Sequence, residues 1–303
     1  MNWSYTHKIA DIVFSTESNY HLGHLERGLF PKFICEGVEA EVLQRFHQVH
    51  PNPNGVEGMA YERTDRADEN LLQASFIRQR CLDVLGNAGQ AEIAADKNQV
   101  IIRDFSHREV DFFFRREPGS DDARLEEVVI SLGYPSSSAL RQIFSTFLPT
   151  FSAALVHSSG VVRNGLAALF VAPSTGGKTT VTKLSNNDPV LSDDQVVFRK
   201  NKDGVMAYST PFGRVTNGPN SAAIGGIFLL KKAVRFELKP LKPVDMLEYI
   251  WASQIEYTYF LPSDVRVLLY QMLYDACHQV PCYAMHFPKD HVDWEAIDHA
   301  MEK

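Results

Sequence analysis

Eight consecutive residues in the second half of the chain have the composition of a loop that binds phosphate groups. They read Ala172-Pro-Ser-Thr-Gly-Gly-Lys-Thr179 and end in the Gly-Lys-Thr of the Walker A pattern G-x-x-x-x-G-K-[ST]. In that pattern glycines let backbone N–H groups surround phosphate oxygens, the lysine neutralises the β- and γ-phosphates, and the following hydroxyl binds Mg²⁺. The alternative is a Gly-Gly turn that happens to precede a lysine.

The sequence on either side of this loop favours phosphate binding. Leu166–Val171 is a short apolar run that predicts a buried strand, and residues 178–185 predict a helix. Strand, loop and helix in this order are the context that the pattern requires. The residues expected to contact a bound nucleoside triphosphate, with ATP as the donor, are Ser174, Thr175, Gly176, Gly177, Lys178, Thr179 and Thr180.

Two adjacent carboxylates add a second chemical feature. Asp193 and Asp194 follow the apolar strand expected at Val190–Leu191, and ligand sites of parallel sheets gather at the carboxyl ends of strands. Phosphoryl transfer needs a carboxylate to hold Mg²⁺ and an acceptor for the proton of the attacking hydroxyl. A solvated acidic turn is the alternative interpretation of this pair.

One histidine is expected near the same place. His157 ends the strand predicted at residues 154–157, ahead of a hairpin whose turn, Asn164-Gly165, is typical of type I′. A histidine beside a phosphate loop can orient or exchange protons with reacting groups. A structural histidine is the equally weighted alternative.

The order of these features resembles the catalytic domain of HPr kinase/phosphorylase and of the wider group of HPr-kinase-like proteins. That family has a histidine-bearing strand, a short hairpin, a phosphate loop, and an apolar strand that ends in Asp-Asp. The resemblance spans about residues 135 to 290 and includes Thr210-Pro-Phe-Gly213 downstream of the aspartates. It implies a fold related to phosphoenolpyruvate carboxykinase and a kinase that uses ATP and Mg²⁺.

The resemblance also implies roles for individual residues. Lys178 would contact the β- and γ-phosphates, and Thr179 would bind Mg²⁺ together with Asp194. Asp193 would be the base toward a substrate hydroxyl, and His157 would orient the acidic pair or the phosphate. The acceptor would be a serine of a peptide or protein, or a small-molecule hydroxyl.

The loop departs from the family pattern at Ala172 and Thr175, which stand where the family has glycines. These departures favour the alternative of a nucleotide-binding pseudokinase or regulatory module without turnover. A carboxykinase-like metabolic enzyme ranks last, because no cluster of arginines and lysines suits a dicarboxylate. Arg214 is a further candidate for the phosphates, with a surface arginine as the equal alternative.

The predicted elements indicate an α/β protein with a mixed sheet and two domains. Residues 1–125 are expected to form a smaller mixed α/β domain that recognises the acceptor, and residues 126–303 the nucleotide-binding domain. In the first part we expect strands at 9–14, 100–103 and 110–114, a turn at 52–55, a helix at 71–85 and a polar linker at 117–123. In the second we expect strands at 196–199, 205–208, 227–230 and 283–287, and helices at 140–148, 244–255 and 263–278.

Composition restricts the remaining function classes. Asp and Glu, at 37, outnumber Lys and Arg, at 30, and the formal charge of −7 does not suggest a nucleic-acid binder. No apolar run reaches the length of a membrane span and no secretory signal is evident, so we expect a cytoplasmic protein without membrane partners. Cys277 and Cys282 are expected to be buried thiols rather than metal ligands. A homo-oligomer is compatible with this composition.

Overall fold

The computed structural model describes residues 3–18, 30–49, 91–95, 99–104, 109–115, 141, 144–185, 188–202, 204–213, 216–255 and 261–302. By their internal contacts, Met1–Lys8, Ile12–Arg27 and Ile34–Phe147 form one unit, and Ile9–Asp11, Gly28–Phe33 and Leu148–Lys303 form the other. The predicted domain boundary at 125/126, the helix at 71–85, the turn at 52–55, the linker at 117–123 and Arg214 lie outside the described residues.

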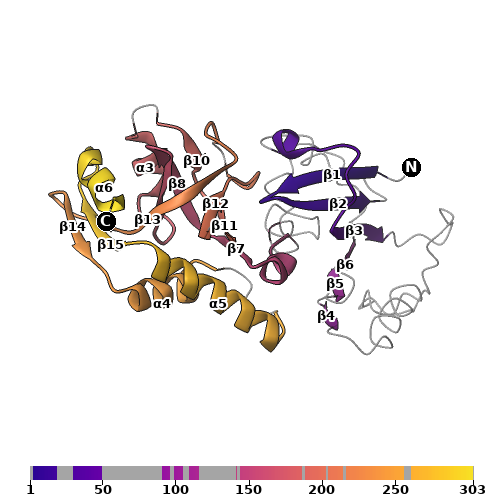
Figure 1. Cartoon of the computed structure of the whole chain (residues 1–303). Helices are drawn as coiled ribbons and strands as arrows, with labels where there is room; N and C mark the ends of the chain where they lie inside the picture. The colour runs from indigo at the N-terminus through magenta and orange to yellow at the C-terminus, as the bar shows by residue number, and fades with distance from the viewer. Residues whose placement is uncertain are drawn as a thin grey trace. The chain divides into compact units, whose positions relative to one another are not determined.

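The first unit contains a six-stranded sheet with the order β1-β2-β3-β6-β5-β4 (Figure 1). Its strands are β1 (Trp3–Ile9), β2 (Ile12–Ser18), β3 (Val42–Val49), β4 (Ala91–Ala95), β5 (Gln99–Asp104) and β6 (Glu109–Arg115). β3 runs parallel to both β2 and β6, whereas β5 is antiparallel to β4 and β6. The strands predicted at 100–103 and 110–114 are thus confirmed as β5 and β6.

The single strand predicted at residues 9–14 is wrong. The chain turns at Ala10 and Asp11, which have φ of 54° and 58°, and these two residues separate β1 from β2. Left-handed backbone at residues other than glycine is uncommon, so the apolar run gave no signal for this turn. It divides the run between two strands.

The second unit is built on a nine-stranded sheet. Seven strands follow the order β10-β8-β9-β13-β12-β11-β7, and β15 lies between β13 and β14. Their bounds are β7 (Ala153–Val156), β8 (Ser158–Arg163), β9 (Leu166–Val171), β10 (Val190–Ser192), β11 (Val196–Asn201), β12 (Gly204–Tyr208), β13 (Ser221–Lys232), β14 (Glu237–Pro240) and β15 (Cys282–Phe287). The helices are α3 (Lys178–Lys183), α4 (Pro243–Ser253), α5 (Ser263–Gln279) and α6 (Trp294–Met301), with the 3₁₀ turns η2 (Phe30–Phe33) and η6 (Leu148–Phe151).

This sheet is mixed and curled. β13 is parallel to β9 and β15, and the other described pairings are antiparallel. β7 ends the seven-strand order and β8 is second at the opposite end, yet His157 alone joins them in the chain. The sheet must therefore curl to bring β7 close to β8. The predicted mixed α/β class is confirmed at this level.

Helices cover both faces of the sheet and form two apolar layers. Side chains of α4 and α5, such as Ile250 and Leu273, pack with one face, and those of α3 and α6, such as Val181 and Ile297, pack with the other. β9 contributes to both layers through alternating residues, which explains its uninterrupted apolar sequence. Each large side chain buried in this way contributes about 1.5–3 kcal/mol.

Several short predicted elements are confirmed in this unit. The strand predicted at residues 166–171 coincides with β9, and the turn before it has φ of 51° at Asn164 and 81° at Gly165, as a type I′ turn requires. Cys277 and Cys282 are buried free thiols. β14 and α6 were not predicted, although Asp293 caps α6 by accepting a hydrogen bond from the Ala296 amide at 3.0 Å.

Candidate active site

The phosphate loop, the acidic pair and the histidine lie at one edge of the sheet. β9 and β10 are each antiparallel to β8, which lies between them, so both run in the same direction and end where β8 begins. The described partner of β10 is the antiparallel β8 and not a parallel strand. The loop after β9, Asp193 after β10 and His157 before β8 nevertheless share this edge.

The loop that follows β9 is a tight turn with two positions that need glycine. The Gly176 amide donates to the Pro173 carbonyl at 2.9 Å, and a Cβ on Gly176 would lie 2.5 Å from the Ala172 Cβ. Gly177 has φ of 112°, and a Cβ there would lie 2.7 Å from Cζ of Phe287. The methyl group of Ala172, in place of the usual first glycine, is thus accommodated because residue 176 has no side chain.

Lys178 folds back over this loop at the start of α3. Its side chain is buried, and Nζ donates to the Ala172 carbonyl at 2.7 Å and to the Pro173 carbonyl at 3.5 Å. Burial lowers the pKa of Lys178, and the negative charge of Asp194 partly opposes that shift. The ammonium group is therefore desolvated and has neutral carbonyl partners. Such a group is stabilised when an anion binds beside it.

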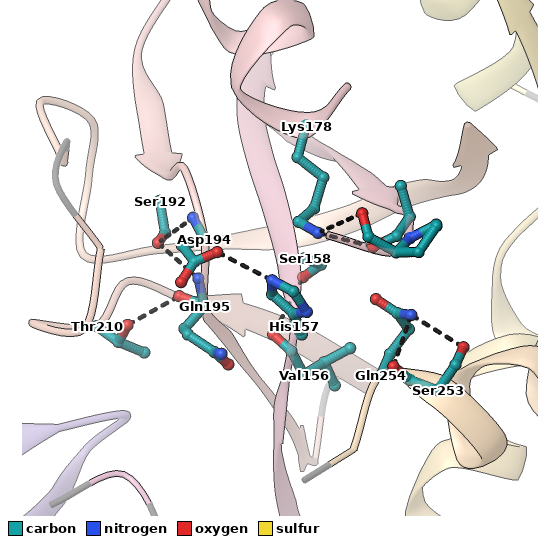
Figure 2. A network of polar contacts seen from close by, with 12 residues as sticks. Val156, His157, Ser158, Lys178, Ser192, Asp194, Gln195, Thr210, Ser253 and Gln254 are labelled. Carbon is teal, nitrogen blue, oxygen red and sulfur yellow. Dashed lines mark hydrogen bonds and ion pairs between the residues drawn. The ribbon is translucent and has the colours of Figure 1, made fainter. Parts of the chain in front are cut away.

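On the other side of β8, Asp194 contacts the histidine. Nε2 of His157 lies 3.0 Å from Oδ1 of Asp194, and both side chains are partly accessible to solvent (Figure 2). The Ser192 hydroxyl accepts from the amides of Asp194 at 3.4 Å and Gln195 at 3.3 Å, which bends the chain after β10. Unlike its neighbour, Asp193 is buried.

Three residues around this pair were not assigned a role by sequence reasoning. The Gln254 carbonyl, at the end of α4, accepts from the His157 amide at 2.9 Å and fixes the junction between β7 and β8. Thr210 donates through its hydroxyl to the Gln195 carbonyl at 2.8 Å (Figure 2). Gly213 lies against Asp193, since a Cβ on it would be 2.6 Å from Oδ1 of that carboxylate. The Thr-Pro-Phe-Gly segment carried a sequence signal for two of them, whereas Gln254 carried none.

The remaining loop residues present hydroxyl groups near solvent. Ser174, Thr175 and Thr179 are exposed and Thr180 is half-buried, and Thr175 has φ of 64°. Among the described residues no three His, Cys, Asp or Glu side chains gather as ligands of one metal ion. A hydroxyl and a carboxylate with phosphate oxygens are, however, the oxygen ligands that Mg²⁺ takes in nucleotide sites. Thr179 and Asp194 fit that chemistry.

Comparisons with known proteins assign no family to this chain. No protein-family model matches the chain, and a search of curated proteins finds no match. In the part of the chain that the structure describes, no helix combines the length and apolar character needed to cross a membrane.

Proposed function

We propose that this chain binds ATP together with Mg²⁺ at the loop of residues 172–179 and transfers the γ-phosphoryl group to a hydroxyl acceptor. One observation carries the proposal. A buried lysine on a glycine-containing loop is electrostatically coupled to Asp194, which itself contacts His157, at the edge where β9 and β10 end. Phosphate binding and proton transfer need these groups in one place.

The contacts and burial of each residue suggest its role in the proposed reaction. Lys178 has no carboxylate within ion-pair distance among the described residues, so its ammonium is suited to the β- and γ-phosphate oxygens. Thr179 and Asp194 would hold Mg²⁺, which neutralises phosphate charge when bound. Asp193, buried beside Gly213, would accept the proton of the attacking hydroxyl, and His157 would hold the Asp194 carboxylate in place.

The resemblance to HPr-kinase-like proteins supports this assignment through the order of motifs. The proposed acceptor is a serine of a peptide or protein, or a small-molecule hydroxyl. Binding of nucleotide without turnover is the competing function, and the left-handed Thr175 in place of a glycine favours it. The two functions differ in whether ATP is consumed.

The test is Mg²⁺-dependent release of phosphate from ATP, with water as the acceptor. We expect slow hydrolysis by the wild type and a loss of about 10²-fold or more in Asp193→Asn, because positioned proton transfer contributes 10²–10⁴-fold. Asp290→Asn is the matched control, because Asp290 is exposed in the segment between β15 and α6. This variant should hydrolyse ATP at the wild-type rate. ATP binding with no hydrolysis in any variant would leave the regulatory module as the function.

A further inference from the structure

The segment after β12 lies beside Asp193 and the residues that follow β10, and we call it the strap. We define the strap as Ser209–Gly213 and Thr216–Gly218. Its far end is fixed to β10, because the amides of Asn217 and Gly218 donate to the Val190 carbonyl at 3.1 and 2.9 Å. The Val190 amide returns a bond to Oδ1 of Asn217 at 2.7 Å. The far end of the strap is therefore tied to β10, the strand that Asp193 and Asp194 follow.

The near end of the strap lies against Asp193 and is bonded to Gln195, the residue after the acidic pair. The Thr210 hydroxyl donates to the Gln195 carbonyl at 2.8 Å and accepts from the Phe212 amide at 3.4 Å. Gly213 approaches Asp193 so closely that any side chain there would collide with Oδ1. The position of the buried Asp193 carboxylate thus depends on where the strap lies.

Residues from the N-terminal part of the chain hold the outer side of the strap. Nζ of Lys32, on η2, donates to the Thr216 carbonyl at 2.7 Å, and the Phe30 ring packs edge-on against Phe212 with centroids 5.6 Å apart. Both residues belong to the same compact unit as the strap, although the chain before and after residues 28–33 belongs to the other unit. Phe30 and Lys32 therefore act as a clamp on the strap.

A second N-terminal contact holds the chain just before the strap. The pKa of the Tyr208 phenol, at the end of β12, is raised by burial and by the nearby Asp11 carboxylate in the turn after β1. Arg199 on the neighbouring β11 donates to the Ala10 carbonyl. Residues 9–11 and 28–33, which belong to the same unit as the strap, thus approach the chain just before the strap and contact the strap again at Phe212 and Thr216.

We propose that Phe30 and Lys32 are positioning residues for Asp193, so that the N-terminal part of the chain sets the rate of phosphoryl transfer without setting nucleotide affinity. The role of Asp193 in this inference rests on the proposed function. The contact of the clamp with the strap does not, and the two are tested separately. The contacts that define the clamp are with Thr216 and Phe212 and not with residues 172–179, which is why nucleotide affinity is expected to stay unchanged.

The structural arm of the test is amide hydrogen exchange on the full chain without nucleotide. Lys32→Met removes the donor to Thr216 and keeps the length of the side chain. It should speed exchange at Phe212, Asn217 and Gly218 by about tenfold, while the amides of residues 172–177 keep their wild-type rates. Lys32→Arg, which restores a donor, should return the strap to wild-type exchange. Unchanged exchange in Lys32→Met and Phe30→Ala would overturn the clamp.

The functional arm measures ATP hydrolysis and ATP affinity in the same variants. Lys32→Met should lower kcat by about tenfold with an unchanged Kd for ATP, and Lys32→Arg should recover most of kcat. The control is Lys202→Met, because Lys202 is an exposed lysine in the turn between β11 and β12. Faster strap exchange with a wild-type kcat would overturn the link to Asp193. If the wild type itself shows no turnover, the proposed function fails and the exchange result alone decides whether the clamp exists.

Discussion

A charged side chain lies near each end of β8, and the protein shifts the pKa values of the two side chains in opposite directions. At the last residue of β8, Arg163 donates to both carboxylate oxygens of Asp298 at 2.8 and 2.7 Å, contacts Asp188, and lies 5.0 Å from the centre of the Trp294 ring. Burial alone would lower the pKa of Arg163, but its hydrogen bond to Asp298, with help from Asp188, raises it. At the edge where β8 begins, Lys178 of the loop has carbonyl groups as its hydrogen-bond partners among the described residues, and burial lowers its pKa.

The difference separates a cluster whose charges are balanced within the protein from one that leaves a lysine to be balanced by the ligand we propose. Arg163 makes bidentate and ring contacts with α6, so its charge is already balanced by the protein. Lys178 gives up hydration and has no carboxylate within ion-pair distance among the described residues, so burial destabilises its charged form more than the charge of Asp194 stabilises it. A phosphate group would supply the missing charge. The start of β8 is therefore the end at which function is expected.

The largest effect on stability should come from replacing Arg163, which is paired with two aspartates at the end of β8. Arg163→Met leaves Asp188 and Asp298 without their partner and removes the contact with Trp294, which ties α6 to the sheet. We expect a loss of about 3 kcal/mol in the free energy of unfolding, at the low end of the range for breaking a buried ion pair because the groups are partly exposed. Urea denaturation measures it. A loss as small as that of an exposed ion pair would remove the contrast between the two ends.

The loop lysine should show a smaller effect with a distinct pH dependence. Its folded pKa lies below the ordinary 10.5, so between the two values the unfolded chain binds more protons, and this group makes stability rise with pH. Lys178→Met lacks that contribution. At neutral pH we expect the variant to unfold within about 1 kcal/mol of the wild type, or to be slightly more stable.

The measurement for this lysine is urea denaturation of both proteins from neutral pH toward 10.5. The stability of the wild type relative to Lys178→Met should increase across that interval. A relative stability that falls with rising pH would mean that Lys178 is stabilised by a negative charge in the folded protein, and the two ends of β8 would then be alike.

Much of the loop and its flanking elements could be predicted from the sequence, because the signals are local. The apolar run of β9, the Asn164-Gly165 turn and the Gly176-Gly177 pair each reflect backbone geometry that a few neighbouring residues fix. Asp293, which caps the N-terminus of α6, is a similar local signal, although α6 was not predicted from it. At the turn of Ala10 and Asp11, Asp11 is a residue type that tolerates left-handed backbone, but Ala10 is not, and the surrounding apolar residues favour a continuous strand.

The contacts around the aspartates could not be predicted in the same way. The His157–Asp194 contact depends on β8 lying between β9 and β10, an order that no local pattern encodes. The bonds from His157 to Gln254 and from Lys32 to Thr216 join residues far apart in the chain. Such partners follow from tertiary packing, so the residues at this edge of the sheet were predictable while the distant contacts that hold them were not.

The most direct test of the account is the stabilisation of the folded protein by nucleotide. At about 100 times its dissociation constant, ATP with Mg²⁺ should add about 2.7 kcal/mol to the free energy of unfolding of the wild type. Lys178→Met should lose most of this gain. Lys183→Met, at an exposed lysine of the same helix, should keep it, and so should Arg163→Met despite its lower starting stability. An equal gain in Lys178→Met and the wild type, or no gain in any variant, would contradict the assignment of the loop as a phosphate site.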